Sequence, residues 1–219
     1  MALIDITVET SQSTFRYRES WGNKISTISS TKNRDNSTVH RLDLCSHSCT
    51  YIETSRHKLD NNINLDDIKL DRFHTEVLVF HLPPDDKNCI TLENFKKVCS
   101  VSEIDIKKGC SILINSGWTF ESANHANYLS GAPYFENELT TYLASLELNI
   151  LAVDTPIIDN QKKPYNAVAG LFDSSPSTLL LAPISLDKSV KFNRKVLLTC
   201  FPLKIKNICA SPCRAVIHS

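Results

Sequence analysis

The amino-acid sequence predicts a single mixed α/β domain over residues 1–219, with more strand than helix. Two nearly continuous apolar runs, residues 76–82 and 110–115, are typical of strands buried on both faces. Apolar residues recur at helical spacing over residues 135–146, which indicates an amphipathic helix packed on a core. That helix leads directly into the apolar run 149–154. The order strand, helix, strand implies a parallel pair with a right-handed crossover.

The N-terminal part contains short segments whose polar and apolar residues alternate, as half-buried strands require. These segments are residues 3–9, 14–17 and 38–45. Residues 26–37 are rich in Ser, Thr, Asn, Lys and Asp and contain few apolar residues. This composition predicts a loop.

The remaining elements are shorter. Pro83 and Pro84 should end the strand 76–82, and Thr91 is a suitable N-cap for a short helix that reaches about Val98. Residues 155–177 show no clear periodicity and are expected to be irregular. Further strands are predicted at residues 178–181, 195–201 and 214–218.

Charge and composition narrow the class of partner. Lys and Arg number 24, Asp and Glu also number 24, and the sequence pI is near 7.0. Such a balanced chain has no net field to attract nucleic acid or an anionic membrane. We therefore expect a small-molecule substrate and no nucleic-acid or membrane partner.

Cellular location is also an expectation from the sequence. The N-terminus carries acids where a signal peptide would carry Lys or Arg, and no apolar run approaches the roughly 18 residues that span a bilayer. The chain should thus be cytoplasmic, with its eight cysteines reduced. The pairs Cys45/Cys49 and Cys209/Cys213 have C-x3-C spacing, which does not match the tighter C-x2-C zinc knuckle.

Residues 47–57, with the sequence HSCTYIETSRH, hold the densest group of potential acids, bases and nucleophiles. Two imidazoles, a carboxylate, a phenol and a thiol within eleven positions would be costly to bury unpaired. The segment is therefore either a solvated loop or a functional site. Its context in the rest of the chain favours the site.

Several segments resemble the cyclase family that includes bacterial kynurenine formamidase, a group of metal-dependent amide hydrolases. Residues 47–57 resemble the family signature H-x-G-T-H-x-D-x-P-x-H. The other similar segments occur in the family's order and cover nearly the whole chain: residues 3–6, 112–118, 154–159, 202–204 and 210–216. This resemblance implies a swivelling β/β/α domain with a partly closed β-barrel and a few flanking helices. It also implies a homodimer or higher homo-oligomer with sites near subunit interfaces.

The resemblance implies that the family's metal site is degenerate in this chain. His47 matches the first metal-binding His, and His57 matches the catalytic His. Tyr51 stands at the second metal-binding His, Glu53 at the bridging Asp and Cys49 at the Gly. The later His and Glu of the family are matched by residues 165–166 and 180–181, which contain neither residue type.

A zinc or manganese site needs about three or four well-placed ligands, so these replacements predict that no catalytic metal or other cofactor is bound. We expect a metal-independent cyclase, dehydratase or hydrolase acting on a biosynthetic intermediate. In this hypothesis His57 and Glu53 transfer protons near His47, and Tyr51 donates a hydrogen bond to a developing oxyanion. Trp118, Tyr165 and Asn166 are the predicted substrate-binding residues.

Three alternatives remain open. Cys49 could act as a nucleophile activated by a neighbouring histidine. The chain could be a non-catalytic binding or scaffolding member that kept the fold and lost the site. It could also retain a metal-dependent amide or ester hydrolase activity, with Zn or Mn held through His47, Glu53 and another ligand.

Overall fold

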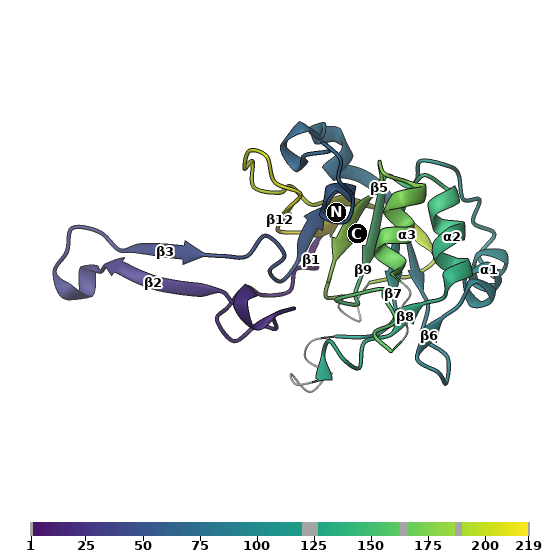
Figure 1. The fold of residues 1–219 in the computed structure, drawn as a ribbon, viewed down its shortest axis with the longest axis horizontal. Coiled ribbons are helices and arrows are strands. Elements are labelled where there is room, and N and C mark those ends of the chain that lie inside the picture. Colours follow the sequence, from purple (N-terminus) through teal and green to yellow (C-terminus); the bar gives the residue numbers. More distant parts are fainter. Residues whose placement is uncertain (1, 120–126, 163–165, 187–189, 219) are drawn as a thin grey trace.

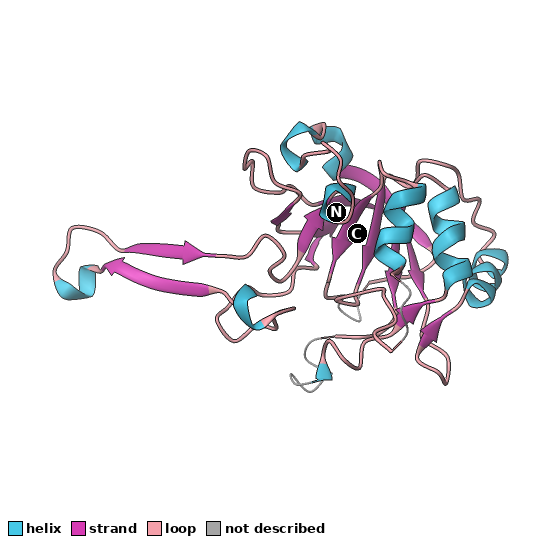
Figure 2. Ribbon diagram, viewed as in Figure 1, coloured by secondary structure: helices cyan, strands magenta, loops and turns pink. Residues whose placement is uncertain are grey.

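The computed structural model describes residues 2–119, 127–162, 166–186 and 190–218. Its centre is a curled nine-stranded mixed sheet, and three helices cover one face of it (Figures 1 and 2). In sheet order the strands are β1 (Leu3–Asp5), β13 (Val216–His218), β11 (Arg194–Thr199), β5 (His74–His81), β7 (Ser111–Asn115), β9 (Ile150–Val153), β10 (Leu179–Ala182), β4 (Tyr51–Glu53) and β12 (Ala210–Pro212). This architecture confirms the predicted α/β fold with a half-barrel sheet.

The centre of the sheet is a parallel block formed by β5, β7, β9 and β10. Successive side chains on each strand pack into two different apolar clusters, one under the helices and one inside the curl of the sheet. Leu151 belongs to the first cluster, for example, and Ala152 to the second. The strands are therefore buried on both faces, as their continuous apolar runs predict.

The three helices are α1 (Leu92–Val101), α2 (Asn137–Ser145) and α3 (Ala167–Ser174). The expected N-cap of α1 is present, because the Thr91 hydroxyl accepts a hydrogen bond from the Asn94 backbone N–H at 3.2 Å. Helix α2 also confirms its prediction, and it lies between the parallel strands β7 and β9 along the chain. Helix α3 contradicts the expectation that residues 155–177 are irregular. Its one sequence signal is Asn166, whose side chain caps the helix.

An arm, the antiparallel hairpin of β2 (Lys24–Ser29) and β3 (Val39–Asp43), extends away from the body of the molecule (Figure 1). The predicted loop 26–37 is thus wrong over Ser26–Ser29, because polar residues that face solvent on both sides of a ribbon give no alternation. The predicted strand 14–17 is also absent. Phe15 and Tyr17 pack in an aromatic cluster with their ring centroids 5.4 Å apart instead of entering a sheet.

The remaining predicted strands are confirmed within a few residues of their expected ends. A further small parallel pair joins β6 (Cys89–Ile90) to β8 (Tyr134–Phe135). Five 3-10 helices complete the described elements: η1 (Glu19–Trp21), η2 (Thr31–Asn33), η3 (Ser55–His57), η4 (Leu65–Asp67) and η5 (Leu70–Phe73). Across the described ranges, the structure contains no helix that is both long and apolar enough to cross a membrane.

Candidate functional site

Residues 47–57 combine a buried strand with a turn of 3-10 helix. β4 (Tyr51–Glu53) lies between β10 and β12 in the sheet, and η3 (Ser55–His57) follows it at once. Both sheet neighbours are antiparallel to β4, and they place Leu180 and Ala210 opposite Glu53. The carboxylate of Glu53 is consequently held on a backbone that is paired on both sides. The segment is a structured site and not a solvated loop.

Glu53 lies between two imidazoles. Its Oε2 atom is 3.0 Å from Nε2 of His47 and 3.8 Å from Nδ1 of His57. The Ser46 hydroxyl lies 2.9 Å from Nδ1 of His47, so both nitrogens of that ring have a partner. The centroids of the two imidazole rings are 4.2 Å apart. The structure thus brings together the three residues that the sequence predicts as the acid–base group.

Burial sets the protonation of this group. It raises the pKa of Glu53 to about 7 against the opposing effect of His57 and Lys58, and it lowers the pKa of His47 to about 4. The pKa of His57 is also lowered by burial, although the Glu53 carboxylate opposes that shift. Near neutral pH the imidazoles are therefore neutral, and Glu53 can accept or donate a proton with little driving force either way.

A cavity of about 180 Å³ opens beside these residues. It lies at the carboxyl ends of β9 and β10, where open α/β sheets commonly bind ligands. One part of its wall is aromatic and aliphatic, and another carries the His47, Glu53 and His57 group with charged residues near the rim. The other lining residues are Tyr17, Arg18, Trp21, Tyr51, Lys58, Val153, Pro156, Ile157, Ile158, Asp159, Val168, Leu180 and Ala182.

Tyr51 lines the cavity with its hydroxyl engaged. The phenols of Tyr51 and Tyr17 are hydrogen-bonded to each other, and the Tyr17 hydroxyl donates to the carbonyl oxygen of Pro156 at 2.7 Å. Because Tyr17 has given its one proton to Pro156, Tyr51 must be the donor in the pair. Burial raises the pKa of Tyr51 well above its usual value, so the phenol stays protonated.

Two cysteines near the site have different surroundings. Cys49 is buried in a left-handed backbone conformation (φ 55°), and its sulfur accepts a hydrogen bond from Asn23 at 3.7 Å. It is not among the described residues that line the cavity. Cys209, which sequence reasoning did not select, places its sulfur within 4.8 Å of ligand atoms of both His47 and His57. Only the pairing of β12 with β4 reveals that approach.

The predicted substrate-binding residues do not gather with this group among the described side chains. Trp118 stacks on Tyr128 and donates its indole N–H to the Tyr128 carbonyl at 3.1 Å. Asn166 accepts a hydrogen bond from the Ala169 backbone N–H as the cap of α3. Neither residue lines the cavity of the Glu53 site. Tyr165 lies outside the described residues.

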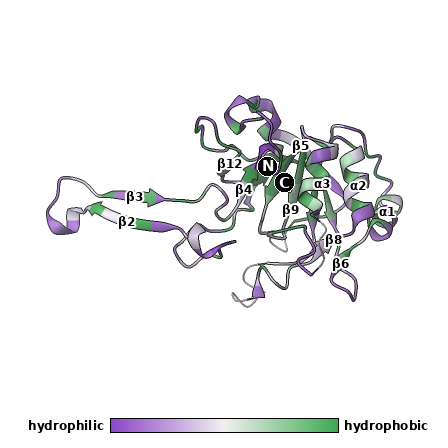
Figure 3. Cartoon of the chain, in the orientation of Figure 1, coloured by the Kyte–Doolittle hydropathy of each residue, from purple (hydrophilic) through white to green (hydrophobic). Residues whose placement is uncertain are grey.

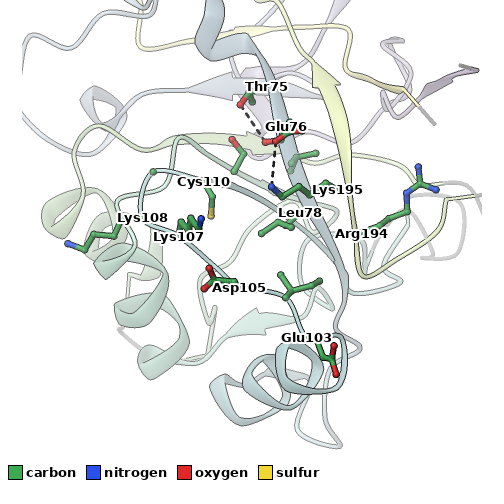
Figure 4. A pocket seen from close by; sticks show the side chains of 14 residues that line it. Thr75, Glu76, Leu78, Glu103, Asp105, Lys107, Lys108, Cys110, Arg194 and Lys195 are labelled. Atoms are coloured by element: carbon green, nitrogen blue, oxygen red, sulfur yellow. Dashed lines mark hydrogen bonds and ion pairs between the residues drawn. The ribbon is translucent and has the colours of Figure 1, made fainter.

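A second hollow, of about 580 Å³, lies by the amino-terminal ends of β5 and β7 (Figure 4). Its walls carry exposed charges of both signs, and Lys195 forms an ion pair with Glu76 at 3.6 Å. No imidazole is among the described residues that line it. It lies at the end of the parallel strands opposite to the one where ligands usually bind, and its chemistry is that of a solvated groove.

Asp154 organises the backbone next to the site. Its carboxylate accepts hydrogen bonds from the backbone N–H groups of Ser116, Gly117 and Trp118 and from the side chains of Asn115 and Ser116, at 2.8–3.2 Å. Burial nevertheless raises its pKa to about 6. Asp154 therefore has a structural role, joining the end of β9 to the turn after β7.

Replacing Asp154 with Ala should destabilise the fold strongly. The substitution leaves the backbone N–H groups of Ser116 and Gly117 without an acceptor, while that of Trp118 keeps the Ser116 hydroxyl at 3.2 Å. We therefore expect a loss of about 3 kcal/mol in the free energy of unfolding. Asp154→Asn keeps one acceptor oxygen facing those groups and should lose about 1 kcal/mol or less. Urea unfolding of both variants measures the difference. Equal losses would show that the hydrogen bonds do not determine the stability.

Comparisons with known proteins identify the family of this fold. The Cyclase family model matches residues 4–160. This range includes all the described residues that line the cavity except Val168, Leu180 and Ala182. The chain belongs to the Cyclase family. No curated protein sequence matches it.

Solved structures with the same fold cover nearly the whole of this cyclase-family chain. Isatin hydrolase A from Labrenzia aggregata bound to benzyl benzoate is 18% identical over 99% of this chain and 93% of its own, with a TM-score of 0.81. Isatin hydrolase A from Ralstonia solanacearum is 17% identical over 99% and 91%, with a TM-score of 0.81. A potential metal-dependent hydrolase with cyclase activity is 19% identical over 99% and 96%, with a TM-score of 0.77. At these identities the likeness establishes the fold.

The donor set here does not fit the metal centre that the family resemblance implies. Tyr51 occupies the position of the second metal-binding histidine, and its protonated phenol is turned to Tyr17. The positions that resemble the later His and Glu of the family include Asn166, which caps a helix, and Leu180, which lies in a strand. Three histidine and carboxylate ligands of the family are thus absent from their matching positions.

Proposed function

We propose that this cyclase-family protein is a small-molecule hydrolase or cyclase that works on a reactive carbonyl group by acid–base catalysis, without the family's metal. One observation carries the proposal: a buried carboxylate with a pKa of about 7 lies between two imidazoles beside a small cavity. Buried acid and base groups tuned towards neutral pH are typical of catalytic sites. The proposed substrate is a biosynthetic intermediate, and dehydration is a further reaction that the same groups support.

The mechanism follows from the positions of the three side chains. The ionised Glu53 takes a proton from a water molecule in the cavity, and the water oxygen forms a bond to the substrate carbonyl carbon. The bond from that carbon to its leaving nitrogen or oxygen then breaks. The proton returns to the leaving atom from Glu53 or through His57, whose Nδ1 is 3.8 Å from the carboxylate. His47 holds Glu53 in place, and ring closure is the reverse of these steps.

The cavity supports a small, partly apolar substrate. Trp21, Tyr51 and Ile158 provide apolar contact surface, and Arg18 and Lys58 near the rim can attract the carboxylate that hydrolysis produces. A volume of about 180 Å³ limits the occupant to a compact molecule. Isatin, the substrate named for two of the structural neighbours, is a suitable probe because it is compact, aromatic and carries an activated cyclic amide.

Loss of the proton-transfer groups should abolish hydrolysis. With isatin and p-nitrophenyl acetate as probes, in the presence of a chelator, we expect Glu53→Gln and His57→Asn to lower kcat/KM by about 10²–10⁴-fold. Glu147→Gln makes the same Glu-to-Gln change at an exposed position and is the matched control. Hydrolysis at equal rates by the wild-type protein and Glu53→Gln would contradict the mechanism, as would activity that requires added Mn²⁺.

A non-catalytic binding role is the second candidate function, because Tyr51 stands where the family resemblance places a metal-binding histidine. The same experiment separates the two. A binding protein would retain affinity for compact aromatic carbonyl compounds, measured by calorimetry, with no turnover in either the wild-type protein or its variants. Turnover that depends on Glu53 excludes this role.

We also propose that the protein partner is a second copy of the chain, which holds the arm. All five residues of β3 are exposed, and Ile28, Val39 and Leu42 on the two strands are 57%, 42% and 61% exposed. Figure 3 shows these hydrophobic segments on the arm. An isolated two-stranded hairpin is only marginally stable in water, so contact with another surface would stabilise it. The family resemblance adds the expectation of a homo-oligomer.

A charge on the face of the arm where Leu42 lies opposite Ile25 should separate the subunits. We expect the wild-type protein to sediment as a dimer or larger assembly and Leu42→Glu to shift it towards the monomer, because burying the new carboxylate in an interface is unfavourable. Arg41→Glu places the same side chain at the neighbouring position and serves as the control. A monomeric wild-type protein, or an assembly that Leu42→Glu leaves intact, would contradict the proposal.

A further inference from the structure

A thiol and two imidazoles converge at the Glu53 site from two segments that are far apart in the sequence. The ligand atoms of His47, His57 and Cys209 all lie within 4.8 Å of one another. His47 precedes β4, His57 ends η3, and Cys209 directly precedes β12. Nothing in the acid–base mechanism uses the thiol of Cys209. Its approach to two histidines therefore calls for a separate chemical explanation.

The backbone holds the three residues in place. The backbone N–H of Thr54 donates to the Cys209 carbonyl oxygen at 2.9 Å, which fixes the start of β12 beside the end of β4. The Ser46 hydroxyl pairs with Nδ1 of His47 at 2.9 Å and orients that ring. A metal-binding histidine usually has such a partner on its other nitrogen. The backbone N–H of His57 donates to the Thr54 carbonyl oxygen at 3.1 Å and ties the third residue to the same stretch of backbone.

The donor types select the ion. Two imidazole nitrogens and a thiolate form a set that suits Zn²⁺, whereas Mg²⁺ and Mn²⁺ prefer carboxylates, carbonyls and water. With Zn–N and Zn–S distances of about 2.0–2.3 Å, the nitrogen and sulfur ligand atoms around a tetrahedral ion lie roughly 3.3–3.6 Å apart. The group needs only a small closure to reach that geometry. His57, whose side chain is 22% exposed, lies at the cavity and gives an ion a path of entry.

We propose that His47, His57 and Cys209 bind one Zn²⁺ ion, and that this ion inhibits the enzyme by occupying the nitrogen of His57. The inhibition, but not the binding, rests on the proposed function. On binding, the Cys209 thiol loses its proton to solvent. The Nε2 atom of His47 exchanges its 3.0 Å contact with Glu53 for the ion, with the ring proton on Nδ1, where it is donated to the Ser46 hydroxyl. The ion accepts one lone pair from each of the three residues. This ligand set is distinct from the one that the family resemblance implies, because it uses the C-terminal thiol and does not use Tyr51.

Cobalt and zinc titrations of the full chain test the binding directly. After chelator treatment and removal of the chelator, we expect one equivalent of Co²⁺ to produce a thiolate-to-cobalt charge-transfer band. Competition with a chromophoric chelator should give a Zn²⁺ affinity that Cys209→Ser weakens by more than about 100-fold. The band should vanish in Cys209→Ser and persist in Cys99→Ser, a partly buried cysteine on α1. Thermal unfolding of each variant checks that it is folded.

The outcomes separate the site from the proposed function. A charge-transfer band that survives in Cys209→Ser, or the absence of stoichiometric binding, would overturn the zinc site. Hydrolysis that continues with chelator and falls when one equivalent of Zn²⁺ is added supports both proposals. Hydrolysis that requires Zn²⁺ would overturn the metal-free mechanism and the inhibition while leaving the binding site in place. Zn²⁺ that binds without changing the rate would overturn the inhibition alone.

Discussion

The pairing of β4 between β10 and β12 is the constraint on which the site depends. Antiparallel partners on both sides fix the register of this three-residue strand. Glu53 therefore lies opposite Leu180 on one side and Ala210 on the other. Leu180 forms part of the cavity wall, and Ala210 follows Cys209. Ladder hydrogen bonds thus bring the Glu53 carboxylate together with an apolar wall and a thiol that both lie more than a hundred residues later in the sequence.

Much of the fold could be predicted because its signals are local. The runs 76–82 and 149–154 are continuous and apolar, and such runs indicate doubly buried strands wherever they occur. The arm is predicted only in part. Alternation over residues 38–45 indicates β3, whereas the mostly polar residues of β2 carry no such pattern. Helix α3 has too few turns to show a clear stripe, and its capping residue Asn166 is predicted from the sequence as a substrate-binding residue.

The candidate site could be predicted only in part, for a related reason. His47, Glu53 and His57 lie within one short segment, so spacing alone suggested that they interact. The contact between that segment and Cys209 depends on strand register across the sheet, which no local pattern encodes. The same limit applies to Trp118, whose indole is turned to Tyr128 and not to the cavity. The local sequence thus predicts which side chains have reactive groups, whereas strand pairing in the sheet determines which of these groups lie next to one another.

The two ends of the arm lead directly into the walls of the cavity. Trp21, just before β2, lies against His47 with ring centroids 5.8 Å apart, and Ser46, just after β3, pairs with the same imidazole. A partner subunit that binds the arm would therefore contact a hairpin whose two flanking segments both touch the His47 ring. If a second subunit holds the arm, as proposed, any factor by which that contact changes the affinity of the cavity for its ligand must equally be the factor by which the bound ligand changes the affinity between the subunits.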